Sequence, residues 1–278
     1  MKFLRKFLDK QAKYFEKGGK LEKLFPVYEM ADTILYTTGK PTSGAAHVRD
    51  ALDIKRTMIT VYYALIPCVL MAFYNSGLQA NLAASQVAQL STELWQTRLM
   101  LALGVPLDPG NFLANFVHGI FFFLPVYIIS LAVGGIWEVI FAVVRKEEVA
   151  EGFLVTSLLF PLILPPTIPY WQVALGISFG VVIGKEVFGG VGMNIFNPAL
   201  MARAFLYFAY PAQISGDKVW IGLDGISQAT ALGQFADPLI ENTYTISEAF
   251  WGFIPGSMGE TSVVACLIGA VILIATGI

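Results

Sequence analysis

The sequence predicts an all-α polytopic membrane protein, and three observations carry that prediction. Of the 278 residues, 56% are hydrophobic and only 14% are charged, and the mean hydropathy is +0.65. Apolar runs close to the ~20 residues that cross a bilayer as a helix recur along the chain. Glycine and proline interrupt several runs, so we expect broken or tilted membrane helices. The net charge of −2 offers no basic surface, and no nucleic-acid partner is expected.

Residues 1–56 predict a cytoplasmic extension ahead of a membrane domain at 57–278. Eight of the 18 Lys and Arg lie within residues 1–23, among apolar side chains that recur every three or four positions. This spacing indicates an amphipathic helix, suited to membrane lipid, to a soluble partner or to plain solvent. A second helical stretch is expected over about 21–36. The extension lacks the apolar core of a cleavable signal peptide.

The first half of the membrane domain predicts two spans of different character. One is expected at about 57–74, followed by a polar connection at about 75–111. The apolar stretch at 111–144 is too long for one simple span, and Pro125 and the pair Gly134-Gly135 interrupt it. It therefore predicts a tilted or broken helix.

Four further spans bring the expected number to about six. The span at about 152–169 is rich in proline, which is tolerable at membrane depth only where neighbouring protein or a cavity pairs the freed backbone groups. The span at 171–188 repeats glycine every four residues, a stripe that lets another helix approach closely. The prolines and glycines of these two spans are Pro161, Pro165, Pro166, Pro169, Gly176, Gly180 and Gly184. An apolar run then reaches about Tyr210, and a final span is expected at about 261–278. Because the chain stops inside that last apolar run, we expect it to be the first part of a longer protein.

The placement of Lys and Arg predicts the orientation of the chain in its membrane. Twelve of the 18 precede the first span, and threading the spans in order places Arg145, Lys146 and Lys185 on the same side. Only Arg98 and Lys218 fall on the opposite side. Since basic residues concentrate in the cytoplasm, the N-terminus is expected to be cytoplasmic and the polar loop at 211–245 periplasmic.

Metal-binding patterns are weak in this sequence. Cys68 and Cys266 both lie in apolar runs, which fits buried thiols better than a disulfide or a metal pair. His47 and His118 are too isolated for a zinc or haem site. No metal centre is expected.

The polar loop at 211–245 contains the most informative short motif, Asp224-Gly225-Ile226-Ser227-Gln228-Ala229-Thr230. One interpretation is a turn that runs into a helix, with Ser227 or Thr230 as the N-cap. The other is a modification site in which an enzyme attaches a group to the Thr230 hydroxyl. The spacing of the residues leaves both interpretations open.

Two acidic residues, Glu138 and Glu186, lie inside or at the edge of expected spans. An ionised group there is costly, and it is usually functional or paired. Glu186 adjoins Lys185, so both side chains could simply reach the membrane interface.

Several ordered blocks resemble the family formed by the B subunits of the bacterial sodium-translocating NADH:quinone oxidoreductase, and the resemblance covers nearly the whole chain. The blocks are His47–Met58, Gly134–Glu138, Arg145–Phe153, Lys185–Gly190, Asn197–Phe205, Tyr210–Asp217, the motif ending at Thr230, and Ile254–Glu260. Gln228 departs from that motif, because the family usually has Gly or Ser before the Ala. The related D subunit of the Rnf complex lacks an extension like residues 1–56, so the extension favours the sodium-pump subunit.

The resemblance implies a membrane flavoprotein of respiration. Flavin transferase would link FMN through its phosphate to Thr230, within the motif of Asp224, Gly225, Ser227 and Ala229. It also implies a non-covalent riboflavin, ubiquinone reduction and Na+ translocation. The complex would have six subunits, this one with A, C, D, E and F, and the extension would meet the A subunit. The family fold resembles that of urea and ammonium channels.

The resemblance also assigns roles to residues in the membrane domain. The quinone region would comprise Gly134, Gly135, Glu151, Gly152 and Phe153, although two adjacent glycines alone more often mean close packing or a kink. For the Na+ path that the resemblance implies, the candidates are Glu138 and Glu186, chosen because they are acidic residues inside or at the edge of expected spans.

Two rival functions remain open. Broken helices and glycine stripes also suit a flavin-free channel or solute transporter. A scaffold subunit, in which the Thr230 loop is an unmodified turn, is the other.

Overall fold

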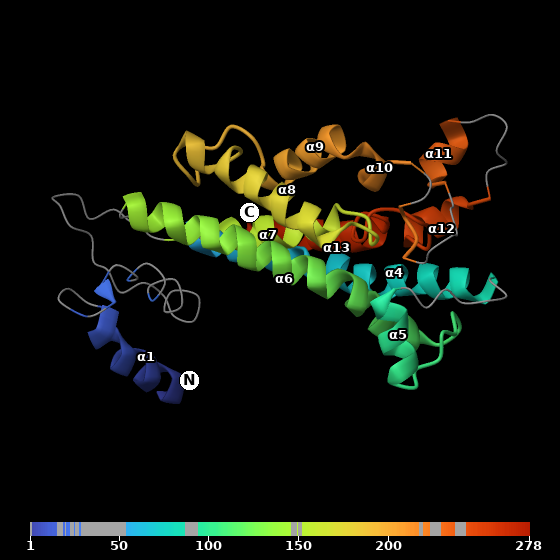
Figure 1. The fold of residues 1–278 in the computed structure, drawn as a ribbon, viewed down its shortest axis with the longest axis horizontal. Coiled ribbons are helices and arrows are strands. Elements are labelled where there is room, and N and C mark those ends of the chain that lie inside the picture. The colour runs from blue at the N-terminus through green and yellow to red at the C-terminus, as the bar shows by residue number, and fades with distance from the viewer. Residues whose placement is uncertain are drawn as a thin grey trace.

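The computed structural model describes residues 2–15, 19, 21, 22, 25, 28, 54–86, 94–145, 149, 152–216, 219–222, 229–236 and 243–278. Within these residues the chain is helical and contains no strand, which confirms the all-α prediction. Figure 1 shows long helices lying side by side around α6, with shorter helices above them.

In the part of the chain that the structure describes, three stretches are long and apolar enough to cross a membrane: Arg56–Gln86, Phe112–Arg145 and Tyr170–Phe188. Three shorter apolar helices accompany them. The elements, in chain order, are α1 (Lys2–Phe15), α3 (Ile54–Ala64), α4 (Ile66–Gln86), α5 (Trp95–Ala102), α6 (Phe112–Arg145), α7 (Gly152–Leu162), α8 (Tyr170–Val182), the 3-10 turn η2 (Glu186–Phe188), α9 (Pro198–Ala209), α10 (Pro211–Ile214), α11 (Ala231–Ala236), α12 (Ile246–Trp251) and α13 (Val263–Thr276).

The predicted amphipathic helix of the extension is present as α1. Its C-terminal end packs on Tyr28, whose ring stacks on Phe15 with centroids 5.4 Å apart and whose hydroxyl donates to the Leu8 carbonyl. Most of the second expected helix, at about 21–36, lies outside the described residues.

The expected boundary after the first span is wrong. Helix α4 continues to Gln86, so residues 75–86 are not part of a polar connection. Asn75, Gln79 and Asn81 are buried against protein there, at 6% exposure or less. Polar side chains can prolong a membrane helix when neighbouring segments pair them, and a count of apolar residues does not reveal this pairing.

Helix α6 is a single unbroken element of 34 residues, although Pro125 lies inside it. At 1.5 Å per residue its length is about 51 Å, well beyond the ~30 Å of a hydrocarbon core. The sequence predicted a tilted or a broken helix, and α6 contains no break. Asn111 caps its start, since the side-chain oxygen accepts from the Leu113 and Ala114 amides at 3.1 and 3.2 Å.

Helices α4 and α6 touch through their backbones. A Cβ on Gly119 would lie 1.7 Å from the Phe73 carbonyl oxygen, and one on Gly77 would lie 1.8 Å from that of Asn115. Only glycine leaves room for this approach. The contact fixes the two longest described helices against each other.

The proline-rich segment after α7 behaves as the sequence predicts. Helix α7 ends at Leu162, and the buried chain continues without helical structure to Tyr170. The Leu162 and Leu164 carbonyls accept from the Gly259 and Met258 amides at 2.8 and 3.0 Å. Neighbouring protein therefore pairs the backbone groups that the broken helix leaves free.

The glycine stripe of α8 packs against α9, which confirms its predicted role in close packing. A Cβ on Gly180 would lie 2.3 Å from the Pro198 carbonyl oxygen and 2.7 Å from Ala202 Cβ. Helix α9 begins at this contact because Asn197 caps it and Pro198 occupies its first turn.

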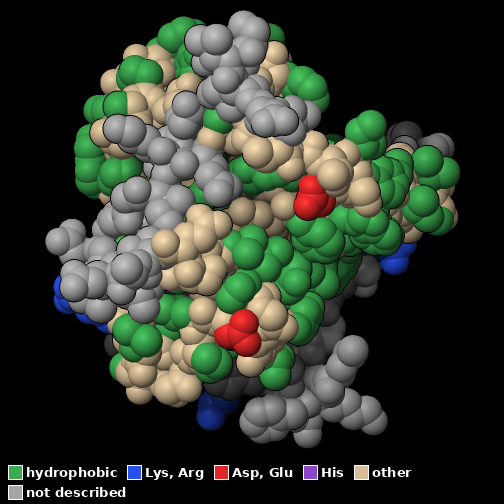
Figure 2. All heavy atoms as spheres, turned by 90° about the vertical axis from the view of Figure 1, so that its right-hand side faces the viewer, with side chains coloured by type: hydrophobic (Ala, Val, Ile, Leu, Met, Phe, Trp, Pro, Cys, Tyr) green, Lys and Arg blue, Asp and Glu red, His purple; other side chains and the backbone are tan. Residues whose placement is uncertain are grey.

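The two ends of the membrane domain differ in charge. Arg56, Arg145 and Lys185 lie toward the end where Gly152 faces Met58 of α3 and Gly190 faces Arg145. Figure 2 views the opposite end, which carries α5, α11 and α12, and shows an apolar surface with two acidic patches and basic atoms only at its margins.

Candidate functional site

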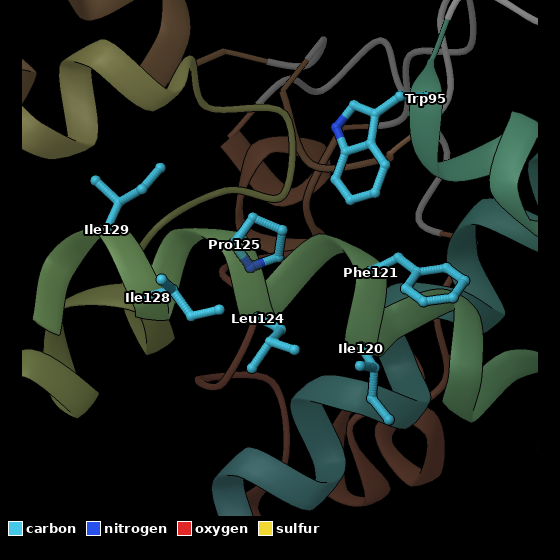
Figure 3. Close-up of a pocket in the computed structure, with 7 residues that line it drawn as sticks. All are labelled: Trp95, Ile120, Phe121, Leu124, Pro125, Ile128 and Ile129. Atoms are coloured by element: carbon cyan, nitrogen blue, oxygen red, sulfur yellow. The ribbon is translucent and has the colours of Figure 1, made fainter. Parts of the chain in front are cut away.

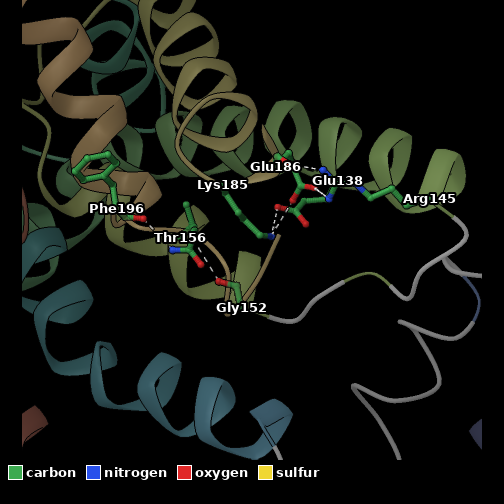
Figure 4. Close-up of polar contacts among 8 residues, drawn as sticks. Glu138, Arg145, Gly152, Thr156, Lys185, Glu186 and Phe196 are labelled. Carbon is green, nitrogen blue, oxygen red and sulfur yellow. Dashed lines mark hydrogen bonds and ion pairs between the residues drawn. The ribbon is translucent and has the colours of Figure 1, made fainter. Parts of the chain in front are cut away.

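Four charged side chains meet at the C-terminal end of α6 and form what we call the ion-pair cluster: Glu138, Arg145, Lys185 and Glu186 (Figure 4). Glu138 and Arg145 are seven residues apart and therefore share one face of α6. Lys185 and Glu186 follow α8 at the start of η2. Gly189 (φ 117°) and Gly190 (φ 93°) then turn the chain away, in a conformation that favours glycine.

The cluster is a continuous chain of ion pairs. Lys185 Nζ lies 2.5 Å from Glu138 Oε1 and 3.4 Å from Glu186 Oε1. Arg145 donates from one guanidinium nitrogen to Glu186 Oε2 at 2.7 Å and from another to the Glu186 backbone carbonyl. The two predicted acidic candidates are thus brought together, with a basic residue on each.

The cluster is buried and lines a cavity of about 170 Å³. The side chains of Glu138, Lys185 and Glu186 are 3–4% exposed, while that of Arg145 is 27% exposed. Buried charges are expensive unless they are paired and hydrogen-bonded, as these are. Lys185 and Glu186 are thus paired inside the protein, and their depth relative to the membrane interface stays a prediction.

The residues predicted for a quinone region also come together. The Phe153 ring of α7 lies against Gly134 of α6, where a Cβ would be 2.5 Å from the ring and 3.1 Å from Ile177. Gly135 faces the same ring at 3.6 Å, an ordinary contact. Gly152 begins α7, and Glu151 lies outside the described residues. Gly134 therefore provides close packing, and α6 continues as a helix through the pair.

Thr230 is half-buried and caps α11. Its Oγ1 accepts from the Gly233 amide at 3.2 Å, so the helix-cap interpretation of Thr230 is confirmed. The modification of Thr230 stays a prediction. The next turn exposes Leu232 and Phe235, at 80% and 71%. Ala229 precedes it, and the other predicted motif residues Asp224, Gly225 and Ser227 lie outside the described residues.

A second buried polar group, which we call the amide network, is one that the sequence did not single out. Its members are Asn75 and Gln79 on α4, which bond to each other, and Asn81, Asn115 and His118, which bond between α4 and α6. His118 Nδ1 donates to Asn81 Oδ1 at 2.8 Å, and Asn81 in turn donates to Asn115 at 2.7 Å. Asn115 donates to the Pro109 carbonyl at 2.8 Å, and Asn75 to that of Ile254 at 2.9 Å. The four-residue spacing of Asn75 and Gln79 was the available signal.

An apolar cavity of about 310 Å³ lies on the outer side of α6 (Figure 3). The Trp95 indole of α5 and Phe121 of α6 line it together with Pro125, which lies between Leu124 and Ile128. The indole N–H points to the Tyr170 hydroxyl, at 2.9 Å. With an apolar lining, the cavity holds nothing that would orient a redox cofactor.

The cysteines lie closer together than their sequence separation suggests. Cys68 and Cys266 are free thiols with their sulfur atoms 4.0 Å apart, across α4 and α13. Cys68 is buried as expected, whereas Cys266 is exposed. Within the described residues there is no group of three or more His, Cys, Asp or Glu that could hold a metal ion.

Comparison with known proteins places these features in context. The model of the NQR2, RnfD, RnfE family matches residues 41–278. The chain is 54% identical over 279 residues to the Na+-translocating NADH-quinone reductase B subunit of Chromohalobacter salexigens, covering 99% of this chain and 67% of that protein. It is 54% identical over 281 residues to the B subunit of Stutzerimonas stutzeri, covering 99% and 70%. For the B subunit of Yersinia pestis the identity is 52% over 286 residues, covering 98% and 69%.

Proposed function

The chain belongs to the NQR2, RnfD, RnfE family, and on that premise we propose that it is the B-type membrane subunit of a sodium-translocating NADH:quinone oxidoreductase. The observation that carries the proposal is identity above 50% to relatives of that name along 98–99% of the chain. A match of 99% includes residues 1–56, the extension that distinguishes this subunit from the D subunit of the Rnf complex. The proposed partners are the A, C, D, E and F subunits, with the A subunit on the extension.

Thr230 is the proposed attachment point for FMN. Its hydroxyl is half-buried at the start of α11 and faces one backbone amide, so it is not enclosed by the core. A phosphoester there would tether the flavin beside Leu232 and Phe235, whose exposed side chains could pack on an aromatic ring system. When bound, FMN would accept and donate single electrons, and the chain's own residues would position it.

The proposed orientation puts Thr230 on the periplasmic side of the inner membrane. It is supported by the gathering of Arg56, Arg145 and Lys185 toward one end of the membrane domain. Helix α11, which Thr230 precedes, lies at the other end (Figure 1). Membrane lipid would surround the apolar outer faces of the long helices.

The ubiquinone region is proposed around Phe153 and the glycine pair of α6. Gly134 leaves the space into which the ring fits, and the ring in turn fixes the local shape of the α6–α7 contact. Because the ring is itself buried at 5% exposure, its proposed role is to fix the shape of this region and not to touch the quinone. A non-covalent riboflavin is proposed from the resemblance alone, without assigned residues.

The Na+ path is proposed to include the ion-pair cluster. Glu138 and Glu186 supply carboxylate oxygens, the ligand type that hard cations prefer, next to a cavity of about 170 Å³. Buried charges at membrane depth are usually functional or paired, and here they are paired.

The test is covalent flavin detected by in-gel fluorescence after denaturing electrophoresis, with flavin transferase co-expressed. Thr230→Ala removes both the acceptor hydroxyl and the cap of α11, whereas Thr230→Asn keeps a capping side chain and removes only the hydroxyl. We expect fluorescence in wild type and Ser227→Ala and none in either Thr230 variant. Fluorescence in Thr230→Asn would overturn the attachment at Thr230 and assign it to another residue. No fluorescence in an inserted wild-type chain would favour a flavin-free channel or a scaffold.

A further inference from the structure

The ion-pair cluster already contains a cation between its two carboxylates. The Lys185 ammonium lies 2.5 Å from Glu138 Oε1 and 3.4 Å from Glu186 Oε1, in a side chain that is only 3% exposed. We infer that Lys185 is an internal competitor, which Na+ must displace from Glu138 in order to bind. The inference rests on the proposed function, because it concerns the Na+ path of that pump.

Charge balance is the first argument. The four described charges of the cluster sum to zero, with Glu138 and Glu186 negative and Lys185 and Arg145 positive. A further Na+ at Glu138 would leave a net positive charge in a buried site, where charge is poorly screened. One cation therefore leaves the carboxylate when another arrives.

The geometry identifies Lys185 as the cation that moves. Arg145 holds Glu186 at two points, its carboxylate at 2.7 Å and its backbone carbonyl, which is the fork-like binding of a guanidinium. Lys185 reaches Glu138 through a flexible four-carbon stem and a single ammonium, which is easier to redirect. The adjoining cavity of about 170 Å³ also borders Arg145, whose side chain is 27% exposed, so the displaced ammonium can move out of the buried site toward that edge while Na+ takes its place.

A static ion pair is the alternative, and it makes a different prediction. If Lys185 only neutralises Glu138 to permit its burial, removing the ammonium lowers stability but does not change how tightly Na+ binds elsewhere. If Lys185 competes with Na+, removing it strengthens Na+ binding. The half-saturating Na+ concentration therefore distinguishes the two.

The experiment uses the assembled, purified complex and two readouts, equilibrium binding of radioactive Na+ and the Na+ dependence of NADH-driven quinone reduction. In Lys185→Gln, the half-saturating Na+ concentration should fall by roughly tenfold in both, because a buried carboxylate has lost its competing cation. In Glu138→Gln/Lys185→Gln this gain should disappear. Arg203→Gln, which removes the cation of the exposed Arg203–Glu260 pair, should leave half-saturation unchanged.

Half-saturation unchanged in Lys185→Gln would overturn the inference. If that variant does not assemble, Lys185→Arg provides the test. A guanidinium binds the Glu138 carboxylate more firmly, so the half-saturating Na+ concentration should rise. An unchanged half-saturating concentration in Lys185→Arg would overturn the inference. Wild-type complex without any Na+ dependence would instead overturn the proposed function. The two failures are therefore distinguishable.

Discussion

Two groups of buried polar side chains lie toward opposite ends of α6, and they differ in charge and surroundings. Toward the N-terminal end, Asn115 and His118 belong to the neutral amide network, whose bonds end on backbone carbonyls. Toward the C-terminal end, Glu138 and Arg145 belong to the ion-pair cluster, whose partners are mainly other charges beside a cavity. Neutral groups tied to backbone specify one packing arrangement, whereas paired charges beside a cavity can exchange partners.

The largest expected effect is a loss of stability, caused by a substitution that breaks the packing around the amide network. Gly119→Ala would place a Cβ 1.7 Å from the Phe73 carbonyl oxygen and force α4 and α6 apart. We expect a loss of about 3 kcal/mol or more, seen as a lower thermal midpoint and poor yield in detergent. Gly135→Ala is the matched control on the same helix, since its Cβ meets only an ordinary contact at 3.6 Å. Equal midpoints for the two variants would contradict the account.

Asn81→Leu interrupts the amide network itself. The change leaves His118 Nδ1 and the Asn115 side-chain oxygen without their partner, and each is buried. We expect a cost of about 2 kcal/mol, measured as a shift in thermal unfolding of the purified complex. The half-saturating Na+ concentration should stay at the wild-type value. A half-saturating Na+ concentration that fell in Asn81→Leu as it does in Lys185→Gln would contradict the proposed difference between the amide network and the ion-pair cluster.

Gly134→Ala perturbs the proposed quinone region, which lies on α6 near the ion-pair cluster. The added Cβ would lie 2.5 Å from the Phe153 ring and would displace that ring. We expect the KM for quinone to rise roughly tenfold, because the displaced ring no longer fixes the shape of the proposed region. Gly135→Ala, whose Cβ would meet the same ring only at 3.6 Å, should raise the KM much less. A KM equal to wild type in Gly134→Ala would remove Phe153 from the proposed region.

The smallest expected effect concerns Glu248, at an exposed helix start away from both buried groups. Hydrogen bonds from the Thr245 backbone and hydroxyl lower the pKa of Glu248, as part of a capping box on α12. A lowered folded-state pKa means that this stabilisation is present at neutral pH and is lost as pH falls through the folded-state pKa. Hydrogen exchange of the first turn of α12 should therefore quicken in acid, after correction for intrinsic rates.

The control for this pH dependence is Glu248→Gln. A glutamine can keep the capping box but cannot titrate, so its corrected exchange should not change across the same pH range. Acid-sensitive exchange in Glu248→Gln would assign the effect to another group.

The sequence predicted the charged group better than the neutral one, for a physical reason. Glu138 and Glu186 stand out because ionised residues are rare in apolar runs, while Asn75 and Asn81 read as part of a polar connection. Whether an amide is solvated or buried depends on partners such as Asn115 and the Ile254 carbonyl, which are distant in sequence. The ion pair of Glu138 with Lys185 likewise depends on how α6 meets the end of α8.

The broken backbone after α7 was predictable because four prolines leave few alternatives, and the break is present. The continuity of α6 was not predictable from the sequence. A single internal proline and a glycine pair are compatible with a kink or with close packing. Contact with Phe153 shows that Gly134 serves close packing, and a local pattern does not contain that information.

The central claim is tested most directly by the mass of the proteolytic peptide that contains Thr230, from the membrane complex purified with flavin transferase present. We predict a peptide heavier by one FMN phosphoester, with fragment ions that place the addition on Thr230 and not on Ser227. An unmodified peptide, in a complex that reduces quinone with Na+ dependence, would contradict the claim.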